Sequence, residues 1–159
     1  MASRIFRHYP ATTSQRAGWL VAGFIFGAIS VLIFHQGALA ILHSLGVTQN
    51  TAWVMRTTAP FGIPQVASIA LWGGAWGVLL AAAVHEFEGA SLVIASIIFG
   101  LVFPTLAAWF IVAAIKGQPL VGGFAPRAMM VGPIVNAAWG LGTGLGLAWL
   151  GGRGRKLIR

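Results

Sequence analysis

Four polar side chains lie within or beside the apolar runs of this chain, and they are its first candidates for chemistry: His35, Gln36, Gln65 and Asn136. A polar group inside a membrane span is costly to bury, so it is a functional candidate by default. With a helix rise of about 1.5 Å per residue, all four fall in the half of the chain's helices that lies away from both termini. Arg56 and Arg127 border the same half.

Together these residues predict a polar pocket with apolar walls in the outer half of a helical bundle. Hydrogen-bond donors beside apolar walls would suit an anionic lipid headgroup, a quinone carbonyl or a polar solute. A second interpretation stays open. Asn136 and Gln65 could be interhelical hydrogen-bonding residues, worth about 1 kcal/mol in lipid, while His35 and Gln36 meet interfacial water.

Other chemistry finds little support in the sequence. No two of the histidines fall at one depth on facing helices, as a bis-histidine haem requires, although a pigment with a single ligand stays conceivable. His85, Glu86 and Glu88 share one short connection without further ligands, so no metal site is expected. The chain has no Asp, which excludes a Ser-His-Asp triad, and its two glutamates are interfacial, which argues against a proton relay. We therefore expect neither an enzyme nor a cofactor.

The composition is that of a membrane protein. Of the 159 residues, 58% are hydrophobic and only 8% are charged, with a mean hydropathy of +0.87, so the apolar surface exceeds what a soluble core of this size would bury. The ten Lys and Arg residues sit at the ends of apolar runs rather than along one face, so the net charge of +8 does not indicate a nucleic-acid partner. The absence of cysteine removes disulfides and thiol chemistry.

Apolar length predicts an all-α integral membrane protein with four transmembrane helices in one up-down bundle, as a single domain over residues 1–159. We expect the spans at about 17–42, 61–84, 90–115 and 128–150, with basic tails at 1–16 and 151–159. The short connection between the second and third spans predicts that these two helices run antiparallel side by side.

The basic residues predict the orientation of these spans. The tails hold seven Lys and Arg residues, whereas the opposite loops hold three: Arg56, Lys116 and Arg127. By the positive-inside rule both termini lie in the cytoplasm, which fits a multi-pass protein of a bacterial inner membrane. The basic tails would contact anionic lipid headgroups.

Glycines at four-residue spacing predict close helix packing, because small residues let backbones approach in lipid. The glycines concerned are Gly23, Gly27, Gly73, Gly77, Gly132, Gly140 and Gly144. They are more numerous than four short spans need for contacts among themselves. The sequence therefore favours an accessory or structural subunit that packs against a larger membrane complex or against copies of itself. The alternative is a small channel or transporter, or a lipid- or quinone-binding protein, that uses the polar pocket.

The last span carries the longest row of small residues, spaced by four from Ala128 to Gly152. Such a row drifts around the helix by about 40° per step. We therefore expect its outer part, around Gly132 and Asn136, and its inner part, around Gly144 and Ala148, to face different neighbours.

The two halves of the chain also share short matches that predict two duplicated helical hairpins in parallel orientation. Ile25-Phe26-Gly27 matches Ile98-Phe99-Gly100, and Trp72-Gly73 matches Trp139-Gly140. Shared membrane composition is the alternative explanation for these matches.

Overall fold

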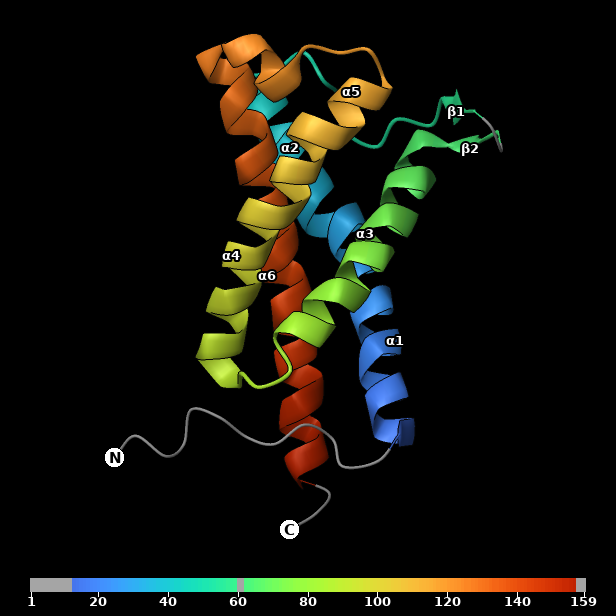
Figure 1. Cartoon of the computed structure of the whole chain (residues 1–159), viewed down its shortest axis with the longest axis vertical. Coiled ribbons are helices and arrows are strands. Elements are labelled where there is room, and N and C mark those ends of the chain that lie inside the picture. Colours follow the sequence, from blue (N-terminus) through green and yellow to red (C-terminus); the bar gives the residue numbers. More distant parts are fainter. Residues whose placement is uncertain (1–12, 60–61, 157–159) are drawn as a thin grey trace.

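The computed structural model describes residues 13–59 and 62–156, with side chains up to Gly152, and this part is mostly helical (Figure 1). The first helical segment joins α1 (Thr13–Ser30), a π-helix η1 (Val31–His35) and α2 (Gln36–Ser44). A small hairpin of β1 (Thr57–Thr58) and β2 (Ile63–Pro64) precedes α3 (Gln65–Ala83). The next segment joins α4 (Gly89–Leu106), a π-helix η2 (Ala107–Val112) and α5 (Ala113–Ile115). A short η3 (Leu120–Phe124) leads into α6 (Pro126–Lys156).

Three helical segments are long and apolar enough to cross a membrane: Thr13–Ser44, Gln65–Ala83 and Gly89–Ile115. Their outward-facing side chains are large and apolar, with Ile25, Ile94 and Ile98 about half exposed, as expected for helix surfaces that meet lipid tails. The fourth long helix, α6, is less apolar, because glycines, Asn136 and Pro133 take the place of large aliphatic residues.

The helices associate as two close pairs, α1 with α3 and α4 with α6, and α1 and η1 join the pairs through α6. In the first pair Gly23 and Gly27 lie against the backbone of Gly77 and Gly73. In the second pair Gly140 lies against the backbone of Ser96. The short connection joins α3 to α4, and these two helices run antiparallel. They diverge with distance from that connection and touch only sparsely (Figure 1). Glycine pairing, rather than chain connectivity, decides which helices pack.

The row of small residues on α6 follows one neighbour over most of its length. A side chain at Gly132 would meet Thr105 and Trp109, and side chains at Gly140 and Gly144 would meet Ser96, all on the α4–η2 segment. From Gly132 to Gly144 the expectation of different neighbours is therefore wrong. A partner whose axis is inclined to α6 stays along a row that winds around it.

The first helical segment packs against a second row of glycines on α6. Cβ atoms at Gly142 and Gly146 would meet the rings of Phe34 and Phe26. A hydrogen bond also connects the two segments, because the buried Trp139 indole donates to the Gly27 carbonyl at 2.9 Å. This contact ties α6 to α1 at the centre of the bundle.

Candidate functional site

A cavity of about 530 Å³ lies between the two helix pairs, at the end of the bundle where α2 and α5 end. The first helical segment and α3 form one wall, and α6 with the turn after α5 forms the other. The lining residues from the helices are His35, Gln36, Leu39, Gln65, Val66, Ile69, Val131 and Val135. The loops contribute Gln49, Asn50, Thr51, Val54, Arg56, Lys116 and Gln118.

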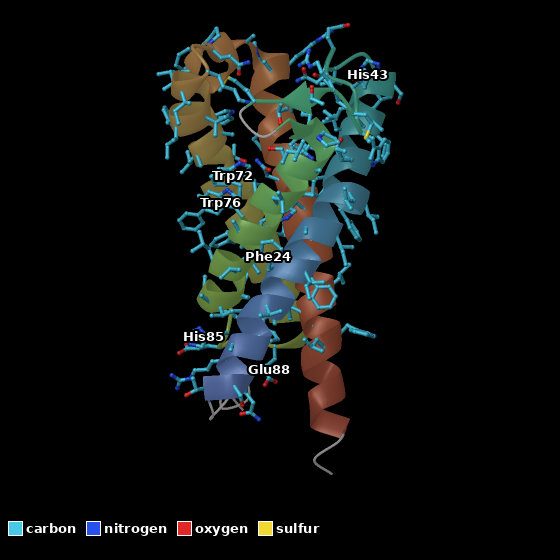
Figure 2. All side chains as sticks on the ribbon, turned by 90° about the vertical axis from the view of Figure 1, so that its right-hand side faces the viewer. Phe24, His43, Trp72, Trp76, His85 and Glu88 are labelled. Atoms are coloured by element: carbon cyan, nitrogen blue, oxygen red, sulfur yellow. The ribbon has the colours of Figure 1, made fainter. Side chains whose placement is uncertain are left out.

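The charge in this cavity has one sign. Arg56 and Lys116 are exposed at its rim, amide side chains lie beside them, and its lining contains no carboxylate. Both glutamates of the chain lie in the α3–α4 connection, and Figure 2 shows Glu88 and His85 at the end of the bundle opposite His43. Cations without a neighbouring acid favour an anion.

The π-helix η1 positions the two polar residues at the inner wall, His35 and Gln36. π-Helical turns of this kind are often found at functional sites. Gln36 is only 2% exposed, with its Nε2 3.4 Å from His35 Nδ1 and its Oε1 accepting a 2.8 Å hydrogen bond from the Trp53 amide. The side chain of Gln36 therefore has partners on both sides and holds the loop above the cavity.

The side chain of Trp53 also anchors this loop to the first helical segment. Its indole Nε1 donates a 2.9 Å hydrogen bond to the Leu32 carbonyl within η1. Trp53 has a φ of +50°, a left-handed conformation that is rare for a bulky residue and needs compensating contacts. The two hydrogen bonds to the helix supply them.

The loop then caps α3 and fixes the rim. The Gln65 amide donates to the Arg56 carbonyl at 2.9 Å, and the Val66 amide donates to the Val54 carbonyl at 3.0 Å. These bonds satisfy amides that a helix start otherwise leaves unpaired. The backbone of Arg56 is thereby held beside Gln65, and both residues line the cavity.

On the opposite wall of the cavity, the path of the chain is determined by the glycine that ends α5. The Gln118 amide bonds to the Ala113 carbonyl at 2.8 Å, the Gly117 amide bonds to the Ala114 carbonyl at 3.1 Å, and Gly117 has a φ of +60°. This is the Schellman pattern, which requires a left-handed residue that glycine adopts without strain. It directs the chain so that Lys116 and Gln118 both line the cavity.

The structure brings together His35, Gln36, Gln65 and Arg56 among the candidate residues, but it separates Asn136 and Arg127 from them. Asn136 Nδ2 donates a 3.0 Å hydrogen bond to Thr105 Oγ1 of α4, so this residue links two helices. Val135 faces the cavity instead. Arg127 is exposed at the start of α6, outside the lining.

Several lining residues are absent from the candidates that the sequence indicated, and they come from loops: Gln49, Asn50, Thr51, Lys116 and Gln118. Their polar character and the position of Lys116 on the same side were visible in the sequence. What brings them to the cavity is the left-handed backbone at Trp53 and Gly117, and a tryptophan gives no signal of that conformation.

Within residues 13–59 and 62–156, no three metal-ligating side chains come together. His85 Nε2 lies 3.7 Å from Glu86 Oε1 at the surface, without a third ligand in the described residues. This contact lies at the end of the bundle opposite the cavity, so the two features are independent.

Comparison of the chain with protein-family models, with curated proteins and with solved structures finds no match. Its function is therefore inferred from the cavity itself.

Proposed function

We propose that this chain is a polytopic membrane protein that binds an anionic ligand in the cavity between its two helix pairs. The observation that carries the proposal is the charge of the lining: Arg56 and Lys116 come from different loops, amide side chains share the lining with them, and no carboxylate competes. Charge-assisted hydrogen bonds to an anion are stronger than neutral ones.

The charge of these two residues is available for a ligand. In the described part of the chain, neither Arg56 nor Lys116 forms an ion pair, because both glutamates lie at the far end. A Lys or Arg near a membrane surface attracts an anion by about 1 kcal/mol. Two such residues would together raise affinity about 30-fold over a neutral cavity.

The position of the cavity supports the proposal, because it lies where two duplicated hairpins would meet. Gly27 lies against Gly73, and Gly100 lies against Gly140, and these are the glycines that the matching segments of the two halves superimpose. The first helix of each pair also passes into a π-helix, η1 or η2. Membrane carriers built from repeats often bind their substrates at the repeat interface.

The proposed topology has α6 as a fourth span and both termini in the cytoplasm of a bacterium. The 31 residues of α6 are about 46 Å long at 1.5 Å per residue, more than a hydrocarbon core of about 30 Å. No charged residue lies between Ala128 and Gly152. In this topology the cavity opens on the outer side of the inner membrane.

An accessory role through exposed glycine faces stays a prediction. The glycines that motivated it, Gly23, Gly27, Gly73, Gly77, Gly140 and Gly144, all have close neighbours within the chain itself. Their number is explained by internal packing, so the cavity is the stronger basis for a function.

Single cysteines in this cysteine-free chain provide the test. Gln65→Cys places a thiol on the cavity wall, and His43→Cys places one at the same end outside the lining. We expect an anionic, sulfonate-bearing maleimide to label position 65 several-fold faster, relative to neutral N-ethylmaleimide, than it labels position 43. The preference should disappear when Arg56→Gln and Lys116→Gln are added. Equal preference at positions 65 and 43 would overturn the proposal.

A further inference from the structure

The lining of the cavity changes character with depth. The rim carries Arg56 and Lys116, whereas the deeper walls carry Ile69 on α3 and Val131 and Val135 on α6. Ile69 lies one helical turn inside α3, and Val135 lies more than two turns inside α6. A small water-soluble anion gains nothing from apolar walls, but an amphiphile does.

Helix packing is sparse on one side of the cavity, between α3 and the η2–α5 segment. One wall includes α3, which packs along α1, and the other includes Lys116 directly after α5, the short helix that packs on η2 and η3. Neither η2 nor α5 packs closely against α3. Figure 1 shows α3 leaning away from α4 and α5 toward the end of the bundle where the cavity lies.

An apolar stripe on α3 continues from the cavity toward the middle of the bundle. Ile69, Trp72 and Trp76 follow one another at helical spacings of three and four, so they share one face. Trp76 meets Phe99 of α4 edge to face, with ring centroids 6.2 Å apart. Figure 2 shows Trp72 and Trp76 projecting from the same side of α3.

Two large aromatic rings, one on α3 and one on α4, are more than half exposed. Trp72 is 69% exposed and Phe103 of α4 is 53% exposed, while Phe99 stacks on Phe103 with centroids 4.8 Å apart. Trp72 lies in the middle of α3, away from the membrane–water interface where exposed tryptophans usually sit. These rings form a surface on which an acyl chain can lie.

We infer that the ligand of the proposed anion site is an anionic lipid, which enters sideways between α3 and the η2–α5 segment. This inference rests on the proposed function and names its substrate class. The phosphate of the headgroup lies between Arg56 and Lys116, and the amides of the rim hydrogen-bond its oxygens. The acyl chains pass Ile69 and lie over Trp72 and Phe103 in the bilayer.

Native mass spectrometry of the full chain in mild detergent tests the inference with three probes. They are dioleoyl phosphatidylglycerol, dioleoyl phosphatidylcholine, and glycerol 3-phosphate as a headgroup without chains. Arg56→Gln with Lys116→Gln removes the rim charges, and Arg127→Gln removes a cation at the same end but outside the cavity. Trp72→Ala removes the acyl-chain surface, and Leu71→Ala removes a neighbour that is also exposed but lies on another face of α3. All these side chains are exposed, so the helical circular dichroism should be unchanged.

We expect phosphatidylglycerol to bind at least tenfold more tightly than phosphatidylcholine, and glycerol 3-phosphate not to bind. The double rim variant should weaken phosphatidylglycerol binding about 30-fold, and Trp72→Ala should weaken it several-fold. Arg127→Gln and Leu71→Ala should leave it unchanged.

Two contrary results have different meanings. If glycerol 3-phosphate binds as tightly as phosphatidylglycerol, with the same dependence on Arg56 and Lys116, the lipid inference is overturned and the anion site stands. If the double rim variant and Arg127→Gln behave alike with every probe, the anion site falls together with the lipid inference.

Discussion

The glycine contact between α1 and α3 allows a sharp test of how the bundle is held together. A Cβ atom added at Gly23 would lie 2.5 Å from the Gly77 carbonyl oxygen and 2.6 Å from the Ala81 Cβ. Ordinary van der Waals contact begins at 3.4 Å, so the new methyl group is 0.9 Å too close to backbone that cannot rotate away. Gly18 lies on the same helix and has nothing within 4 Å of its added Cβ.

Two opposing effects set the outcome of Gly23→Ala. Alanine favours a helix over glycine by about 1 kcal/mol, whereas forcing a methyl group into a packed interface costs typically 1–3 kcal/mol. Here α1 and α3 must also separate along their shared glycine face, which weakens dispersion contacts at Gly27 and Gly73 as well. We therefore expect Gly23→Ala to destabilise the protein by about 1–2 kcal/mol. Gly18→Ala, with only the helix term, should be neutral or slightly stabilising.

The assay is unfolding of the purified protein by increasing mole fractions of sodium dodecyl sulfate in mild detergent micelles, followed by tryptophan fluorescence. Gly23→Ala should unfold at a lower fraction than the unmodified chain, and Gly18→Ala at an equal or higher one. Coincident unfolding curves for the two variants would refute the reasoning, because they would show that the backbones do not meet at Gly23.

Three further substitutions test single hydrogen bonds, two between helices and one that anchors the loop above the cavity. Trp139→Phe removes the buried hydrogen bond to the Gly27 carbonyl and should lower stability by about 1 kcal/mol in the same detergent assay; an unchanged midpoint would show that the bond is not formed. Gln36→Leu removes the acceptor of the Trp53 amide, so hydrogen exchange measured by mass spectrometry should accelerate in residues 45–56, and unchanged exchange would contradict this anchoring. Asn136→Leu should cost about 1 kcal/mol of stability without changing the maleimide preference of Gln65→Cys, and a lost preference would place Asn136 at the cavity after all.

Hydropathy and small-residue spacing predicted the helices well, because both depend on local composition. The expected spans at 17–42, 61–84 and 90–115 correspond to the apolar segments Thr13–Ser44, Gln65–Ala83 and Gly89–Ile115. Their pairing was harder to predict. Glycine faces on α1, α3 and α6 show that helices pack closely but not which helix meets which, and the short connection after α3 indicated the wrong neighbour for α4.

Counting residues along each expected span was enough to place His35, Gln36 and Gln65 in the same half of the bundle, and all three line the cavity. Depth alone does not give the rotation of a helix about its axis. Val135 and Asn136 differ by one residue and about 100° of rotation, and that rotation turns Asn136 toward α4. The loop residues depend on backbone conformations at Trp53 and Gly117 that residue type only partly reveals.

The same packing that makes the helix pairs rigid accounts for the cavity between them. Inside each pair, glycine lets backbone touch backbone, as at Gly23 and Gly140. Between the pairs, the rings of Phe26 and Phe34 stand against α6, so the pairs are held apart by the width of a side chain. Toward the loop end that spacing is no longer filled, and polar loops rather than helices close it. A ligand bound there would contact both pairs at once, so its binding free energy would depend on their separation, and a ligand that favours one separation would shift the protein toward it.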